Sequence, residues 1–187
     1  IGVDDQNPDE VLPEFITKVA NSGCSVFIIH ARKALLRGLS PKDNRTIPPL
    51  QYPLVYEMQK NFPGLDIILN GGLTELKEMK SCVKNRVAGV MIGREAYQNP
   101  SILLNVDNEI FDQKEKVRSM KDAIRNMIEY CNREKAEGTA IKGILKHLKG
   151  AFKGRANSKE FKRVLFCNET TDSEKLERLS NLVPIYC

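Results

Sequence analysis

The chain has 187 residues, of which 41% are hydrophobic and 28% are charged, a composition typical of a globular protein. No apolar run approaches the roughly 18 residues that a membrane span needs, so we expect no membrane partner. Two histidines are too few for a histidine-rich metal site, and five scattered cysteines form no CxxC pair. We therefore expect no metal and reduced thiols, as in a cytoplasmic protein.

The first residue is Ile1 rather than Met, and it lies in what reads as the tail of a strand, Ile1–Val3. The sequence therefore reads as a fragment whose natural N-terminus is missing. An organellar targeting signal stays open for the same reason.

Charge is distributed unevenly along the chain. Up to Phe111 there are 12 Lys and Arg against 13 Asp and Glu, whereas from Asp112 onward the counts are 17 and 11. The second part therefore carries a basic surface, which favours a polyanionic partner.

The first part alternates helical patterns with short apolar runs. Apolar residues at helical spacing predict a helix over Val11–Ala20, which Gly23 ends. The continuous run Ser25–Ile29 is typical of a strand buried on both faces. A long polar connection, Lys33–Leu50, follows, and long ordered loops on α/β scaffolds are usually functional.

The alternation continues to residue 111, and its members are a helix Tyr52–Asn61, a strand Leu65–Leu69, a helix from Leu73, a strand Val87–Ile92 and a helical segment from Glu95. This order indicates a parallel α/β sheet. The strands are too few to close on themselves, so residues 1–111 are predicted to form half of a barrel.

Residues 112–187 show helical patterns only, over Lys116–Lys135, Ala140–Lys153, Ser158–Phe166 and Ser173–Leu182. We predict a small all-helical domain here. The second helix carries a stripe of lysines at helical spacing: Lys142, Lys146, Lys149 and Lys153. Such a stripe is often only a solvated face, but the scarcity of acids nearby favours RNA.

Two glycine-containing turns follow predicted strands, Asn70-Gly71-Gly72 and Gly93-Arg94. Glycines at strand ends let backbone N–H groups approach an anion, and an arginine adds a forked positive charge. The last two βα loops of a (β/α)8 barrel commonly hold a phosphate in this way. The turns therefore predict a site for the phosphate of a cofactor or nucleotide, and two ligand-free turns are the alternative.

The segments IIHARKALLRGLSPKDNRTIPPLQYPLVY, ILNGGL and VMIGREAYQNP closely resemble the tRNA-dihydrouridine synthases, specifically their A-type subfamily. The similarity runs over essentially the whole chain. It implies the C-terminal half of a (β/α)8 barrel that binds FMN, followed by a small helical domain that contacts tRNA. It also implies an enzyme that uses NADPH to reduce D-loop uridines to 5,6-dihydrouridine.

The resemblance also assigns roles to residues. His30, at the carboxyl end of its strand, would contact FMN, and Asn70, Gly71, Gly72, Gly93 and Arg94 would hold its phosphate. Arg32, Lys42 and Arg45 would face tRNA from the long loop, and Lys159 and Lys162 from the helical domain. The alternatives are a core histidine and solvated surface charges.

The family's proton-donating cysteine precedes a proline, and no cysteine here does so. We therefore expect no catalytic residue in this chain, a missing N-terminal half of the barrel as its partner, and no activity of the fragment alone. Two other functions stay open: a non-catalytic RNA-binding module on the same scaffold, and another phosphate-binding barrel oxidoreductase.

Overall fold

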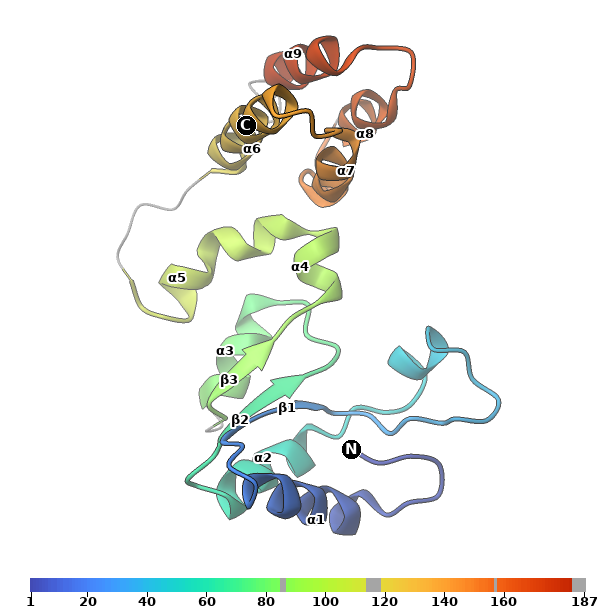
Figure 1. Ribbon diagram of the computed structural model, residues 1–187. Helices are drawn as coiled ribbons and strands as arrows, with labels where there is room; N and C mark the ends of the chain where they lie inside the picture. The colour runs from blue at the N-terminus through green and yellow to red at the C-terminus, as the bar shows by residue number, and fades with distance from the viewer. Residues whose placement is uncertain (85–86, 114–118, 157, 183–187) are drawn as a thin grey trace. The chain divides into compact units, whose positions relative to one another are not determined.

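The computed structural model describes residues 1–84, 87–113, 119–156 and 158–182. The chain divides into two compact units, Ile1–Ile92 and Gly93–Cys187, each described here by itself (Figure 1). No helix within the described ranges is long and apolar enough to cross a membrane.

The first unit is a three-stranded parallel sheet in the order β1-β2-β3, with helices in the connections (Figure 1). Its elements are α1 (Pro8–Ala20), β1 (Val26–His30), α2 (Tyr52–Asn61), β2 (Asp66–Asn70), α3 (Leu76–Lys84) and β3 (Gly89–Met91). The predicted mixed α/β architecture is therefore confirmed. The predicted strand tail at the start of the chain is only a single parallel bridge, between Val3 and Ala34.

Local sequence explains where α1 begins and ends. The Asn7 side chain accepts a hydrogen bond from the Asp9 N–H, and Pro8 occupies the first helical position, where no N–H is needed. After the helix, the Gly23 N–H donates to the Ala20 carbonyl at a backbone φ of +97°, which glycine adopts without strain. Leu12 and Ile16 are the residues of α1 that enter the core.

The prediction that the first strand is buried on both faces is wrong. Phe27 and Ile29 are buried, whereas Val26 and Ile28 are 49% and 57% exposed. The register pairs Ile28 with Ile68, and β2 alternates in the same sense. Helices therefore cover one face of the sheet, and no described segment of this unit covers the other.

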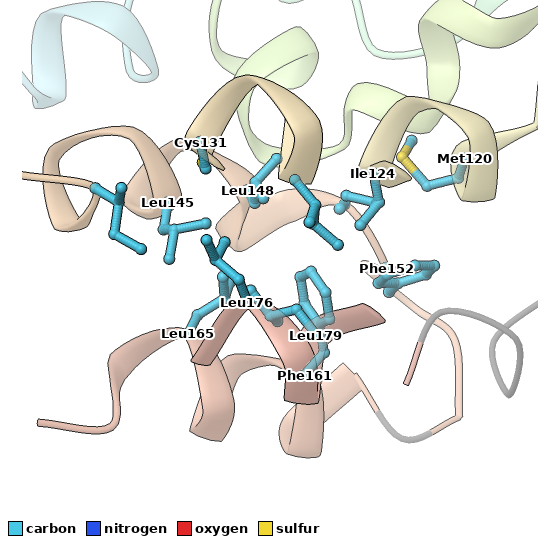
Figure 2. Close-up of a cluster of buried hydrophobic side chains, with 13 residues drawn as sticks. Met120, Ile124, Cys131, Leu145, Leu148, Phe152, Phe161, Leu165, Leu176 and Leu179 are labelled. Carbon is cyan, nitrogen blue, oxygen red and sulfur yellow. The ribbon is translucent and has the colours of Figure 1, made fainter. Parts of the chain in front are cut away.

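The described part of the second unit contains only helices. These are α4 (Arg94–Gln98), the 3₁₀ helix Pro100–Asn105, α5 (Val106–Glu109), α6 (Met120–Ala136), α7 (Lys142–Leu145), the 3₁₀ helix Lys146–Gly150, α8 (Ser158–Phe166) and α9 (Asp172–Leu182). The predicted start of the long helix at Lys116 lies outside the described residues. Figure 2 shows the cluster of buried hydrophobic side chains of this unit. The rings of Phe152 and Phe161 pack edge to face in it, with their centroids 4.8 Å apart.

The expectation of a single α-helix over Ala140–Lys153 is wrong. Four α-helical residues are followed by the 3₁₀ helix Lys146–Gly150. Gly143 and Gly150 both lie within the expected helix and weaken an α-helix by about 1 kcal/mol each relative to alanine. Helical spacing of the lysines could not reveal this change of helix type.

The boundary between the compact units also differs from the sequence-based boundary after Phe111. Residues 93–111 belong with the helical unit, because α4 packs against the 3₁₀ helix Lys146–Gly150. The Tyr97 hydroxyl lies 3.2 Å from Nδ1 of His147, and Lys153 forms an ion pair with Glu95 at 3.3 Å.

Candidate cofactor site

Side-chain hydrogen bonds join the carboxyl ends of all three strands. Register places His30 beside Asn70 and Asn70 beside Met91. Nδ1 of His30 lies 2.6 Å from Oδ1 of Asn70, and the Asn70 amide nitrogen donates to the Met91 carbonyl at 2.8 Å. The residues expected at the cofactor from β1 and β2 are therefore in direct contact.

The other ring nitrogen of His30 has no protein partner. Nε2 is buried and makes no hydrogen bond within the described residues. A buried polar atom without a hydrogen-bond partner lowers the stability of the folded state by about 1–3 kcal/mol. A ligand that forms a hydrogen bond with this nitrogen would remove that cost.

Gly71 and Gly72 form a turn that only glycine fits. Their φ angles are +120° and +70°. A Cβ on Gly72 would lie 2.5 Å from Cδ1 of Leu50, and one on Gly71 would lie 3.3 Å from Cε1 of His30. The described residues supply no acceptor for either backbone N–H.

Tyr52, the first residue of α2, forms a hydrogen bond with this turn, a role that the sequence did not predict. Its hydroxyl donates to the Gly71 carbonyl at 2.5 Å. Burial, aided by the charge of Glu78, raises the pKa of Tyr52 to about 12, so the hydroxyl remains a donor at neutral pH. The available signal was the position of Tyr52 directly after the long loop, within the segment that carries the resemblance.

The long loop is ordered by its own polar groups. The Asn44 side chain accepts from the Leu35 N–H and donates to the Leu35 carbonyl, both at 2.7 Å. The Arg32 guanidinium donates to the carbonyls of Thr46 and Pro48. Arg32 thus stabilises the loop, while its predicted contact with tRNA stays a prediction.

The remaining residues predicted at tRNA lie on the surface of their own units. Lys42 directly precedes the short 3₁₀ helix Asp43–Arg45 of the loop, Arg45 is the last residue of that helix, and both are exposed. In the second unit Lys159 is exposed and Lys162 half-buried on α8. All four contacts with RNA stay predictions.

Gly93 and Arg94 begin the second unit, as the N-cap and first residue of α4, and both are exposed. They follow β3 and Ile92 in the sequence, as expected of a βα turn. Their predicted role at a phosphate stays a prediction.

The four described cysteines form no disulfide. Cys82 and Cys131 are buried and Cys24 and Cys167 half-buried, all as free thiols. Within the described ranges, no group of three His, Cys, Asp or Glu could hold a metal ion.

Comparison with known proteins places the chain in a family. The family model "Dihydrouridine synthase (Dus)" matches residues 1–184. The chain belongs to the dihydrouridine synthase family. It is 46% identical over 166 residues to the tRNA-dihydrouridine(20/20a) synthase of Escherichia coli K12, covering 88% of this chain and 48% of that protein.

Two further relatives carry the same name. The protein of Vibrio cholerae is 45% identical over 87% of this chain and 50% of its own length. The protein of Salmonella typhi is 43% identical over 98% of this chain and 56% of its own length. The chain therefore spans about half the length of the curated relatives that it matches. The resemblance in the sequence is confirmed at the level of the family.

The dihydrouridine synthases are flavin enzymes, and the residues of this chain fit a flavin phosphate or ribityl group. His30 offers an unpaired buried nitrogen, and the turn of Gly71 and Gly72 leaves two N–H donors without an acceptor. Backbone donors at the carboxyl end of parallel strands are suited to an oxyanion.

Proposed function

We propose that this chain is the C-terminal part of a tRNA-dihydrouridine synthase, which reduces D-loop uridine to 5,6-dihydrouridine with FMN as cofactor and NADPH as reductant. The observation that carries the proposal is the meeting of His30, Asn70 and the Gly71-Gly72 turn at one sheet edge in a member of this family. A cytoplasmic place of action belongs to the same proposal.

The sheet supports the interpretation as half of a (β/α)8 barrel. Helices cover one of its faces, as on the outside of a barrel. The other face carries exposed Val26, Ile28 and Met91, which would be the inside. Because β1 is an edge strand, a preceding strand can pair with it, and the parallel bridge between Val3 and Ala34 has the required direction. An N-terminal half of the barrel is therefore the expected partner.

In this proposal the chain binds and orients the cofactor and does not donate the proton to uracil. His30 would contact the flavin through Nε2, and the N–H groups of Gly71 and Gly72 would bind its phosphate side. Gly93 and Arg94 keep the phosphate-binding role that the sequence predicts for them. When bound, the flavin supplies hydride for the C5–C6 double bond of the base. The proton donor would be a cysteine of the N-terminal half.

The tRNA partner is supported by the distribution of charge. Eight basic residues and one acid lie between Gly138 and Arg163. Lys159 and Lys162 lie on α8 within this segment and are the proposed contacts from the second unit. The proposed contacts from the long loop are Lys42 and Arg45, together with Arg32, which directly precedes the loop. Such residues bind phosphates and position the RNA rather than read its sequence.

The function is tested on the complete protein, with the upstream coding sequence included. We expect it to be purified with bound FMN and to form dihydrouridine in unmodified tRNA when NADPH is supplied. Binding of tRNA without uptake of FMN would instead favour the non-catalytic RNA-binding module. FMN uptake without salt-dependent tRNA binding would favour another barrel oxidoreductase.

The RNA contacts are tested by charge reversal. Lys162→Glu should weaken tRNA binding and reduce the slope of log affinity against log salt by about 1. Lys60→Glu makes the same charge change at an exposed residue of α2 in the first unit and serves as the matched control. Equal effects of the two variants would show that only net charge matters and would contradict a contact at Lys162.

A further inference from the structure

The orientation of the Asn70 side-chain amide is determined by its neighbours. Its nitrogen lies 2.8 Å from the Met91 carbonyl oxygen, which can only accept a hydrogen bond. An amide turned by 180° would bring two oxygens together. The Asn70 carbonyl oxygen must therefore face His30, from which it is 2.6 Å distant.

This orientation in turn determines which nitrogen of His30 carries hydrogen. Oδ1 of Asn70 can only accept, so Nδ1 must be the donor. In a neutral ring Nε2 then has a lone pair and no hydrogen. The 2.6 Å separation is slightly shorter than the roughly 2.7–3.2 Å usual for an N–H···O bond, and a Cβ added at Gly71 would lie only 3.3 Å from Cε1 of the ring, so the turn leaves the ring little room to move.

We propose that Asn70 is a positioning residue that holds His30 in its Nδ1–H tautomer, so that the unpaired Nε2 is the ring atom presented to the ligand. The functional consequence rests on the proposed flavin site. A neutral His30 accepts a hydrogen bond from a ligand hydroxyl or N–H, such as a ribityl hydroxyl. A phosphate or carbonyl oxygen can face Nε2 only when the ring carries a second proton.

Asn70 thus has a role beyond that of a phosphate-turn residue. Its backbone carbonyl already accepts from the Ala31 N–H at 2.8 Å, so the main chain at Asn70 ties β2 to the segment after β1. The side chain adds a different function, because it selects between two forms of a ring that differ only in the position of one hydrogen.

Long-range ¹H–¹⁵N NMR on the FMN-free complete protein, with ¹⁵N confined to these 187 residues by segmental labelling, reads the tautomer directly. The chain has two histidines, so each ring can be assigned, and His147 beside Tyr97 is an internal reference remote in sequence from Asn70. At a pH above the ordinary imidazole range, we expect His30 to show hydrogen on Nδ1 and a lone pair on Nε2. The opposite pattern in the wild-type chain would overturn the proposal.

One variant removes the acceptor. Asn70→Ala should allow a substantial Nε2–H population in His30. An unchanged tautomer in Asn70→Ala, with the amide dispersion of β1 preserved, would refute the positioning role. If the alanine variant does not fold, exchange of the wild-type Nδ1 proton decides: slow exchange with water supports the bond, and fast exchange contradicts it.

An FMN titration of the complete protein is the separate test of the flavin site. Failure to bind FMN would refute the proposed function while leaving the tautomer result intact. A wild-type ring with hydrogen on Nε2 would refute the inference even in a protein that binds FMN.

Discussion

Gly72→Ala tests whether the turn at the sheet edge is as tightly enclosed as the structure indicates. The backbone φ of +70° would place alanine in the left-handed region, at a cost of about 1–2 kcal/mol. The new Cβ would also lie 2.5 Å from Cδ1 of Leu50, so the leucine must move. Overpacking of this kind costs about 1–3 kcal/mol. Because alanine restricts the unfolded chain, about 0.4–1 kcal/mol is recovered.

Taking the middle of each range, the expected loss in the free energy of unfolding is about 3 kcal/mol. Urea unfolding followed through the backbone amide signals of Ile67 and Leu69 reports on the sheet. Gly38→Ala is the matched control, because Gly38 has a φ of +86° and nothing within 4 Å of its Cβ position. The control should lose about 1 kcal/mol.

A double-mutant cycle isolates the contact with Leu50. Leu50→Ala removes the group that the new Cβ meets, so in its background Gly72→Ala should cost about 1 kcal/mol less. If Gly72→Ala loses no more stability than Gly38→Ala, or if Leu50→Ala brings no relief, the close contact is refuted. The same variants should weaken FMN binding by the complete protein, because the turn is the proposed phosphate site.

Two further changes test the second unit. Gly150→Ala would place a Cβ 2.5 Å from the Gln98 carbonyl oxygen, a backbone atom, and should lower the free energy of unfolding of this unit, measured in urea, by about 1–3 kcal/mol. Gly143→Ala is the control, because nothing lies within 4 Å of its Cβ position and no such loss is expected. Equal effects of the two variants would contradict the close packing at Gly150. The Thr171 N–H and hydroxyl hold the pKa of the Glu174 carboxyl below its usual range. A depressed folded-state pKa gives stability that is present above the unfolded-state pKa and lost as pH falls through the folded one. Glu174→Gln should therefore reduce the acid-induced loss of helical circular dichroism, and an unchanged profile would refute the linkage.

Local sequence was sufficient wherever a segment's own pattern and its end signals agree. α2 was predicted to the residue as Tyr52–Asn61 and α8 as Ser158–Phe166. In both helices apolar residues recur at helical spacing, and Pro63-Gly64 directly after Phe62 ends α2. The expected helix over Ala140–Lys153 failed, because its spacing fits both helix types and its glycines weaken the α form.

Burial could not be read from the strand sequences alone. The run Ser25–Ile29 is apolar at every position after the serine, and such a run fits a strand covered on both faces. Which face is covered depends on segments far away in the chain. In the structure only the face of Phe27 and Ile29 is covered.

The sequence by itself determined the strand–helix order, the glycine turns after the strands and the family. Only the tertiary structure decided how the site residues meet. His30 and Asn70 are 40 residues apart, and their hydrogen bond exists because the parallel register of β1 and β2 places them side by side. Register is set by packing between distant segments, so neither this contact nor the positioning of the turn by Tyr52 follows from local pattern.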